Sequence, residues 1–301
     1  MTIETRVPMV DIEHLMQELG FENEAMESLN ADLARILACD RAKQMLFEAV
    51  NAYAADKNTD FSALLRKAAE AGASVGVHEY SAHMLLCLLL APYLRAYYRE
   101  ADIDDSIFVE SMTDLRWKLW ECNMLKGVYG TFVGTWYGLF FGMRMFGLGR
   151  LQYEIRRFRR TYEKDGKRLE PDSLVLGVHI PRTLTPFSQE NCDESFARAK
   201  AFFAGRLGDA PLAFVCNSWL LYPENERILH EKSNIRKFMA RFDITEHTDV
   251  EDYDELWSVF DMEYTGNIED FPEDTFLRRA YKEHLRHGGK TGRGFGVFFA
   301  Q

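Results

Sequence analysis

The sequence predicts a multidomain α+β protein, in which an all-helical N-terminal domain precedes a mixed α/β C-terminal domain. In the first 125 residues or so, apolar residues recur at the three-to-four spacing of helices with one buried face. Beyond Gly149, short apolar runs of strand length alternate with helix-like segments. A chain of 301 residues is long enough for two domains. We therefore expect domains at 1–125 and 149–301, joined by a segment at 126–148.

The N-terminal domain is expected to be a bundle of antiparallel helices. Leu29, Leu33 and Ile36 mark the apolar face of the first long helix, and the polar run from Asp56 to Asp60 separates it from the next. Short polar joints of this kind connect antiparallel neighbours. The expected helical segments are 24–53, 61–68, 77–98 and 104–125.

The joining segment contains an uncharged stretch from Gly127 to Met143, 17 residues between Lys126 and Arg144. Its glycines recur every four residues, which allows another backbone to approach closely in a membrane or in a soluble core. Seventeen residues is also the short limit for a membrane span. Because no second span and no basic flank accompany it, we expect a buried, glycine-ridged connecting helix over 126–148, and no membrane partner.

The C-terminal domain is expected to interleave strands and helices, which is typical of α/β and α+β folds. A charged connection with Asp165-Gly166 at its turn predicts a hairpin over 159–172. Helices are expected to begin near Asn191, where Glu194 has capping-box spacing, and at Ser233. A last helix is expected over 273–286, and the acidic run 246–255 as a solvated connection. The expected strands are 151–158, 173–180, 212–220, 254–262 and 294–299.

Composition narrows the class of protein and its partners. With 47 acidic and 36 basic residues the formal net charge is −11, which argues against a nucleic-acid partner. Five cysteines without a CxxC pair fit neither a disulfide framework nor a zinc site, so we expect reduced thiols and no metal. The first residues lack the apolar core of a signal peptide. These features predict a cytoplasmic protein.

Four sequence motifs, taken in their order along the chain, resemble those of a known family. They are GLGRLQYE (147–154), VLGVHIP (175–181), FVCNSWLL (214–221) and SNIRKFMARF (233–242). They are similar to acyltransferase-domain proteins that join a helical N-acyltransferase-type N-terminal domain to a GNAT-like C-terminal domain. The resemblance implies a GNAT-type fold and acyl transfer from a coenzyme A thioester, acyl-CoA or acetyl-CoA, to an amine acceptor. It leaves the amine and the length of the acyl chain open.

His179 and Glu154 are the candidate bases for such a transfer. His179 ends an apolar strand, and histidine titrates near neutral pH without perturbation. It could equally serve as a structural hydrogen-bonding group. Glu154 lies on an otherwise apolar strand, where a carboxylate can act as a base, although Arg156 and Arg157 offer it a plain salt bridge. Tyr281 on the last helix occupies roughly the region from which GNAT enzymes supply a tyrosine acid.

Asn217 and Ser218 are candidates for positioning the acyl carbonyl or an oxyanion. A hydrolase that uses Ser218 or Cys216 is an alternative, although the sequence around Ser218 lacks the glycines of a GxSxG elbow. Cys216 is otherwise a buried thiol. A further alternative is a GNAT-like module that senses ligands or binds a partner without catalysis.

Two places could hold the phosphates of coenzyme A. GNAT enzymes use an (R/Q)xxGx(G/A) turn between a strand and a helix, and Arg144 to Gly149 fits that string, but a helix-like segment precedes it and a strand follows. The turn before the helix at Ser233 has the required order. Ser233 and Asn234 would cap that helix, and Arg236 would lie in its first turn. Capping alone also explains the serine and the asparagine.

Overall fold

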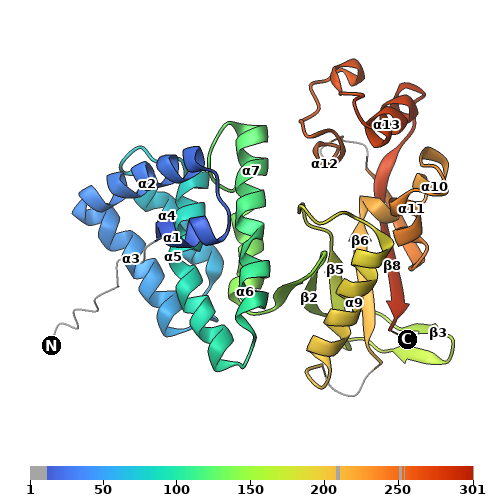
Figure 1. Ribbon diagram of the computed structural model, residues 1–301, viewed down its shortest axis with the longest axis horizontal. Helices are drawn as coiled ribbons and strands as arrows, with labels where there is room; N and C mark the ends of the chain where they lie inside the picture. Colours follow the sequence, from blue (N-terminus) through green and yellow to red (C-terminus); the bar gives the residue numbers. More distant parts are fainter. Residues whose placement is uncertain (1–11, 208–210, 251–252, 254, 301) are drawn as a thin grey trace. The chain divides into compact units, whose positions relative to one another are not determined.

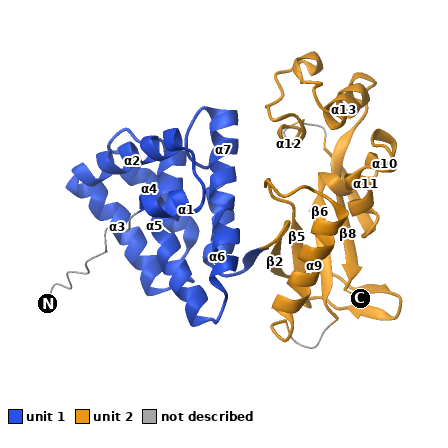
Figure 2. Ribbon diagram, viewed as in Figure 1, with its two compact units in different colours: residues 1–147 blue, residues 148–301 orange. Residues whose placement is uncertain are grey.

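The computed structural model describes residues 12–207, 211–250, 253 and 255–300. The chain divides into two compact units, Met1–Gly147 and Leu148–Gln301 (Figure 2). Unit 1 is helical apart from its last residues, and unit 2 is built on a six-stranded sheet. The expected α+β class, with helices first and a mixed α/β domain second, is therefore confirmed.

Unit 1 packs its helices around α5, which is buried on nearly every side. A helix that is apolar all round is a core element, and the leucine-rich run from Leu85 to Leu90 supplies that surface. Helices α3 and α4 pack against α5 and against each other (Figure 1). The helices of the bundle are α1 (Ile12–Glu18), α2 (Asn23–Ala38), α3 (Asp40–Ala55), α4 (Phe61–Ala73), α5 (Glu79–Glu100), α6 (Asp105–Met112) and α7 (Asp114–Lys126).

Polar residues set the starts of several of these helices. The Asp60 carboxylate accepts a hydrogen bond from the Ser62 N–H at 3.0 Å, and the Asp104 carboxylate accepts one from the Ser106 N–H at 2.8 Å. The expected helix over 24–53 is wrong in one respect, because it is interrupted at Cys39, whose backbone is extended with φ −105° and ψ 113°. The helix expected over 104–125 is likewise two helices, divided at Thr113.

The glycine-ridged connecting helix over 126–148 is wrong. Gly127 ends α7 in the left-handed conformation with φ +66°, and the chain continues through a loop to a short turn η1 (Gly134–Trp136) and helix α8 (Tyr137–Phe141). Gly130 shows why: a Cβ there would lie 2.3 Å from the Tyr80 carbonyl carbon, so glycine lets a loop, not a helix, press against α5. Within the described residues, no helix is long and apolar enough to cross a membrane.

The sheet of unit 2 has the strand order β1-β2-β5-β6-β8-β7. Strand β5 runs parallel to β6, whereas the pairs β2–β5, β6–β8 and β7–β8 are antiparallel. The strands are β1 (Met145–Leu148), β2 (Leu151–Arg157), β5 (Leu174–His179), β6 (Ala213–Ser218), β7 (Asp243–Val250) and β8 (Thr291–Phe299). A separate hairpin, β3 (Tyr162–Lys164) and β4 (Lys167–Leu169), turns at Asp165-Gly166 as expected.

Side chains on the sheet alternate between two faces. On one face, Tyr153, Phe214 and Phe298 form ring contacts around Phe196 of helix α9 (Gln189–Phe203), which lies along the sheet in Figure 1. On the other face, Val175, Val215 and other residues form a core that Tyr162 and Leu169 of the β3–β4 hairpin join. Helix α9 thus packs on one face of the sheet and the β3–β4 hairpin on the other.

Three sequence-based expectations in unit 2 need correction. The expected strand over 254–262 contains the short helix α12 (Trp257–Phe260), whose Val259 and Phe260 pack with α13 (Phe276–Arg286) in a small apolar core. The run 246–255, expected as a solvated connection, begins within β7, an edge strand exposed on most of its length. Helix α9 is capped by Ser188, not Asn191. β7 lacks the apolar pattern of a strand because most of its side chains are exposed.

Candidate active site

The parallel strands β5 and β6 separate toward their carboxyl ends. Their register within the described chain contains two pairs, Leu176 with Phe214 and Gly177 with Val215. Both strands continue, β5 to His179 along β2 and β6 to Ser218 along β8. The facing edges beyond Gly177 and Val215 therefore carry backbone N–H and C=O groups that do not pair with each other. Such edges can bind the amide groups of an extended ligand.

Three predicted residues share one face at this opening. His179 lies two residues beyond Gly177, and Asn217 lies two residues beyond its partner Val215, so both point to the same side of the sheet. Glu154 on β2 is directly opposite Gly177 and belongs to that side too. The strand order thus brings together residues from 154 to 217 in the sequence.

The His179 imidazole and the Glu154 carboxylate form a close pair, with 3.1 Å between Nε2 and Oε2. Their side chains are 26% and 17% exposed, so the pair is shielded yet reachable. Arg156 lies 3.9 Å from the same carboxylate oxygen. A Cβ at Gly177 would lie 3.3 Å from Oε2 of Glu154, and glycine therefore leaves room for the pair. A carboxylate bound to one ring nitrogen fixes the orientation of the imidazole, which is how histidine bases are held in enzymes.

Ser218 does not join this group. Alternation places it with Cys216 on the opposite face of β6, and its hydroxyl accepts a hydrogen bond from the Leu220 N–H at 3.2 Å. Cys216 is buried, and burial raises the pKa of its thiol to about 12. Neither side chain therefore has the setting of an activated nucleophile.

Arg150 is a buried cation close to the segment that follows β5. It lies in the tight turn between β1 and β2 and is 7% exposed. One guanidinium nitrogen donates to the Pro181 carbonyl at 2.9 Å, and the guanidinium carbon lies 5.1 Å from the centre of the Phe187 ring. Its Nε is buried without a hydrogen-bond partner, and burial lowers the pKa of Arg150.

No carboxylate among the described residues lies within ion-pair distance of the Arg150 guanidinium. Burying a charge without a counter-charge costs free energy, and a bound anion removes that cost. The residues that Arg150 contacts, Pro181 and Phe187, belong to the segment leading into α9. Helix α9 begins after Ser188, which accepts from the Asn191 N–H at 3.2 Å. A helix start carries partial positive charge and adds to the same preference for an anion.

The predicted phosphate residues lie beside this helix start. The Gln189 side chain donates to the Asn234 carbonyl at 3.4 Å, and helix α11 (Asn234–Met239) thereby starts next to α9. Ser233 caps α11, as expected, by accepting from the Arg236 N–H at 3.1 Å. The Arg236 guanidinium donates to the Leu229 carbonyl at 3.5 Å. The cap is present, and a phosphate contact by Ser233, Asn234 or Arg236 stays a prediction.

Two other sequence candidates have structural roles. Tyr281 is 3% exposed, its hydroxyl donates to Asn225, and burial raises its pKa above the usual value. The string Arg144 to Gly149 forms β1 and the start of its turn, with Gly149 at φ +77°, so it does not connect a strand to a helix. Sequence reasoning missed Arg150, the next residue; an arginine inside an apolar hairpin was the available signal.

Two family models match the chain. One, described as a GNAT-like C-terminal domain, matches residues 145–298, and the other, described as an N-acyltransferase N-terminal domain, matches residues 10–143. Both matches agree with the family resemblance that the four sequence motifs indicated, and they confirm it. No curated protein matches the chain.

Solved acyltransferase structures share the fold. One in complex with decanoyl-CoA and teicoplanin is 24% identical with a TM-score of 0.71, over 96% of this chain and 88% of that chain. Another in complex with CoA and 10C-teicoplanin is 24% identical with a TM-score of 0.73, over 97% and 88%. A mutant acyltransferase in complex with octanoyl-CoA is 23% identical with a TM-score of 0.71, over 96% and 88%. The likeness covers both parts of the chain.

Proposed function

Because the chain belongs to the acyltransferase family that combines an N-acyltransferase N-terminal domain with a GNAT-like C-terminal domain, we propose that it transfers an acyl group from acyl-CoA to an amine. The observation that carries the proposal is the opening between β5 and β6 beside the His179–Glu154 pair. It offers, at one place, a base and two strand edges that do not pair with each other.

The donor fits this opening by its chemistry. The diphosphate of coenzyme A would lie near Arg150 and the start of α9, where the orphaned Nε indicates a place for an anion. The amide groups of its pantetheine arm would bind between β5 and β6, where the two strands no longer pair with each other. An arm held there would carry the thioester toward Glu154 and His179. The solved neighbours with decanoyl-CoA and octanoyl-CoA support an acyl-CoA donor.

The reaction needs no covalent acyl-enzyme. The amine nitrogen attacks the thioester carbon and forms the C–N bond, and the C–S bond then breaks to release the thiolate. His179 takes the proton that the attacking nitrogen loses, directly or through water, and the thiolate receives a proton as it leaves. Glu154 holds the ring of His179 in position. We propose that the exposed Asn217, on the same face, donates to the developing oxyanion.

The test measures binding and turnover separately. Calorimetry with CoA, acetyl-CoA and decanoyl-CoA should show binding, and release of free thiol should report acyl transfer across a panel of amines. The variant His179→Ala should keep the binding and lose the turnover. Absence of binding to all three ligands at millimolar concentration would leave the proposal without support.

One observation favours a catalytically inactive sensing module as the second candidate. The segment 180–188 between β5 and α9 contains no glycine, whereas the phosphate turns of GNAT enzymes use glycines. Binding of acyl-CoA without turnover of any amine would favour this module. A hydrolase has less support, since Ser218 caps a turn and Cys216 is buried. Ester hydrolysis that Ser218→Ala abolishes would restore it.

A further inference from the structure

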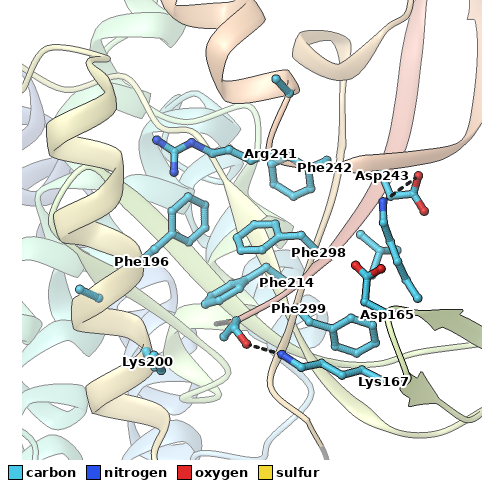
Figure 3. Close-up of a pocket in the computed structure, with 15 residues that line it drawn as sticks. Asp165, Lys167, Phe196, Lys200, Phe214, Arg241, Phe242, Asp243, Phe298 and Phe299 are labelled. Carbon is cyan, nitrogen blue, oxygen red and sulfur yellow. Dashed lines mark hydrogen bonds and ion pairs between the residues drawn. The ribbon is translucent and has the colours of Figure 1, made fainter.

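A second cavity lies in unit 2, away from the opening between β5 and β6. It has a volume of about 730 Å³, within the range of small-molecule sites. Its walls come from α9, the residues 240–242 that follow α11, the start of β7, the end of β8 and the β3–β4 hairpin (Figure 3). Phe214 of β6 lines it, but Phe214 and Asn217 point to opposite faces of the sheet. Val297 and Phe299 also line it, and they share the face of Asn217. The cavity is nevertheless distinct in place, because it lies at the start of β6, around Phe214, whereas the candidate active site lies near the end of that strand, at Asn217.

The floor of the cavity is aromatic. The rings of Phe214 and Phe298 stack with centres 4.9 Å apart, and Phe196 meets them edge-on at 5.0 and 5.1 Å. Phe298 and Phe299 are only partly buried although both are large apolar side chains at the end of a strand. Such rings offer apolar and edge-to-face contacts to a ligand with an apolar body.

The rim of the cavity is positively charged. Four cations, Lys164, Lys167, Lys200 and Arg241, line it together with two carboxylates, Asp165 and Asp243. These six side chains sum to +2, and Asp193, which binds Arg241 from outside the lining, lowers the local sum to +1, in contrast to the net charge of −11 for the whole chain. A concave positive region in an acidic protein concentrates anions locally.

The rim cations differ in how their charges are compensated. Lys164 lies 3.4 Å from Asp243, and Arg241 is bound to Asp193. Lys167 donates to the Ala300 carbonyl at 2.9 Å. This carbonyl is neutral, so it occupies one of the three N–H donors of Lys167 and does not compensate the charge of the ammonium. In the described part of the chain, no carboxylate lies within ion-pair distance of Lys167. Figure 3 shows Lys167 and Lys200 on either side of the phenylalanine floor.

The edge of β8 adds a backbone donor. The register with β7 ends at Asp243 opposite Val297, whereas the register with β6 continues to Phe299. The Ala300 N–H donates to Leu212 on the β6 side at 2.8 Å. Because backbone groups alternate along a strand, the N–H and C=O of Phe299 point to the side where β7 is absent. Asp243, the first residue of β7, lines the cavity on that same side of β8.

We propose that this cavity binds a small organic anion with an apolar body, of the class of alkyl or aromatic carboxylates. The rings of the floor hold the apolar body, and Lys167, Lys200 and the Phe299 N–H hold the carboxylate. The site is separate from the acyl-transfer site and does not depend on it. Unit 2 would then bind a second ligand in addition to acyl-CoA.

The test titrates the full chain with octanoate and with 1-octanol, which has the same body and no charge. Octanoate should bind about tenfold more tightly than the alcohol, the scale of one charge-assisted hydrogen bond. The double variant Lys167→Ala/Lys200→Ala should lose that difference. The matched control Lys232→Ala removes an exposed lysine outside the cavity and should change nothing.

A blocking variant tests the cavity itself. Ala197 is exposed on α9 and lines the cavity, so Ala197→Trp fills it without disturbing the core. It should abolish binding of both ligands at an unchanged melting temperature, whereas Glu194→Trp, also exposed on α9 but outside the lining, should not. Saturating CoA should leave octanoate binding intact. Octanoate affinity that CoA removes, or that neither Ala197→Trp nor the lysine variant reduces, would overturn the proposal, as would no binding at millimolar concentration.

Discussion

The buried carboxylates of unit 1 and the buried Arg150 of unit 2 differ in how their charges are compensated, and Arg150 differs in this from Lys282 of its own unit, which is buried 3.4 Å from Glu273. In unit 1, the buried Asp114 carboxylate accepts from the Tyr137 hydroxyl at 3.0 Å, and the buried Glu121 lies 2.7 Å from the Lys118 ammonium. In unit 2, the buried Arg150 has a backbone carbonyl and a ring as its partners, and its Nε has none. Removing one partner of a buried pair destabilises a fold, whereas a buried charge without a counter-charge favours the binding of an oppositely charged group. The difference predicts which substitutions affect stability and which affect binding.

The largest expected effect contrasts a histidine from each unit. His179→Ala removes the proposed base and should lower turnover by about 10²- to 10⁴-fold while CoA affinity stays the same. His83 in unit 1 is partly buried, and burial lowers its pKa, so His83→Ala should lower the melting temperature and keep turnover per folded molecule. Steady-state kinetics and thermal unfolding of both variants check this. Equal turnover in His179→Ala and the wild type would remove His179 from the mechanism.

The next effect concerns Arg150. Arg150→Met keeps a long side chain and removes the charge, so CoA affinity should fall by about 10- to 100-fold, as for the loss of charge-assisted hydrogen bonds. Because the uncompensated charge costs free energy when buried, the melting temperature should stay the same or rise. Arg227→Met, at a side chain that is 81% exposed, is the matched control. A lower melting temperature with unchanged CoA affinity would show that Arg150 is a structural residue. Arg150 would then no longer differ in role from the buried carboxylates of unit 1.

Asp114 is the counterpart of Arg150 in unit 1. Asp114→Ala leaves the buried Tyr137 hydroxyl without its acceptor and should lower the free energy of unfolding by about 1–3 kcal/mol. CoA affinity should not change. Asp114→Asn keeps an acceptor oxygen and should cost less. Denaturant unfolding of both variants provides the measurement, and a loss of CoA affinity at full stability would contradict the assignment.

The smallest effect compares two helix caps. Ser233→Ala in unit 2 and Asp104→Ala in unit 1 should each lower stability by about 1 kcal/mol, because each leaves a helix N–H without its side-chain acceptor. If α11 contributes to the phosphate site, Ser233→Ala, Asn234→Ala and Arg236→Ala should also weaken CoA binding, whereas Asp104→Ala should not. Unchanged affinity in all four variants would restrict the phosphate site to Arg150 and the start of α9.

Local sequence rules determined much of this protein. Ser233 was recognised as a cap because a serine before a helix accepts a backbone hydrogen bond wherever the helix lies. The Asp165-Gly166 turn adopts φ of +50° and +74°, which few other residue pairs favour. Strands β2, β5 and β6 follow from apolar runs of strand length. Each of these signals depends only on residues close in the sequence, so it can be recognised without knowing which distant segments pack against it.

Only the tertiary structure decided the composition of the site. Glu154 and His179 are 25 residues apart, and their contact depends on the register of β2 with β5. The sequence alone could not reveal on which face of the sheet the His179–Glu154 pair lies, and so that Asn217 shares this face and Ser218 does not. Nor could it reveal that Arg150 is buried. Both facts depend on strands and loops that are distant in the chain. The same holds for Gly127 to Met143, where the close contact of Gly130 with α5 requires a loop before the short elements η1 and α8. Local conformation is encoded by neighbouring residues, whereas register, burial and the separation of β5 from β6 arise only when distant segments pack.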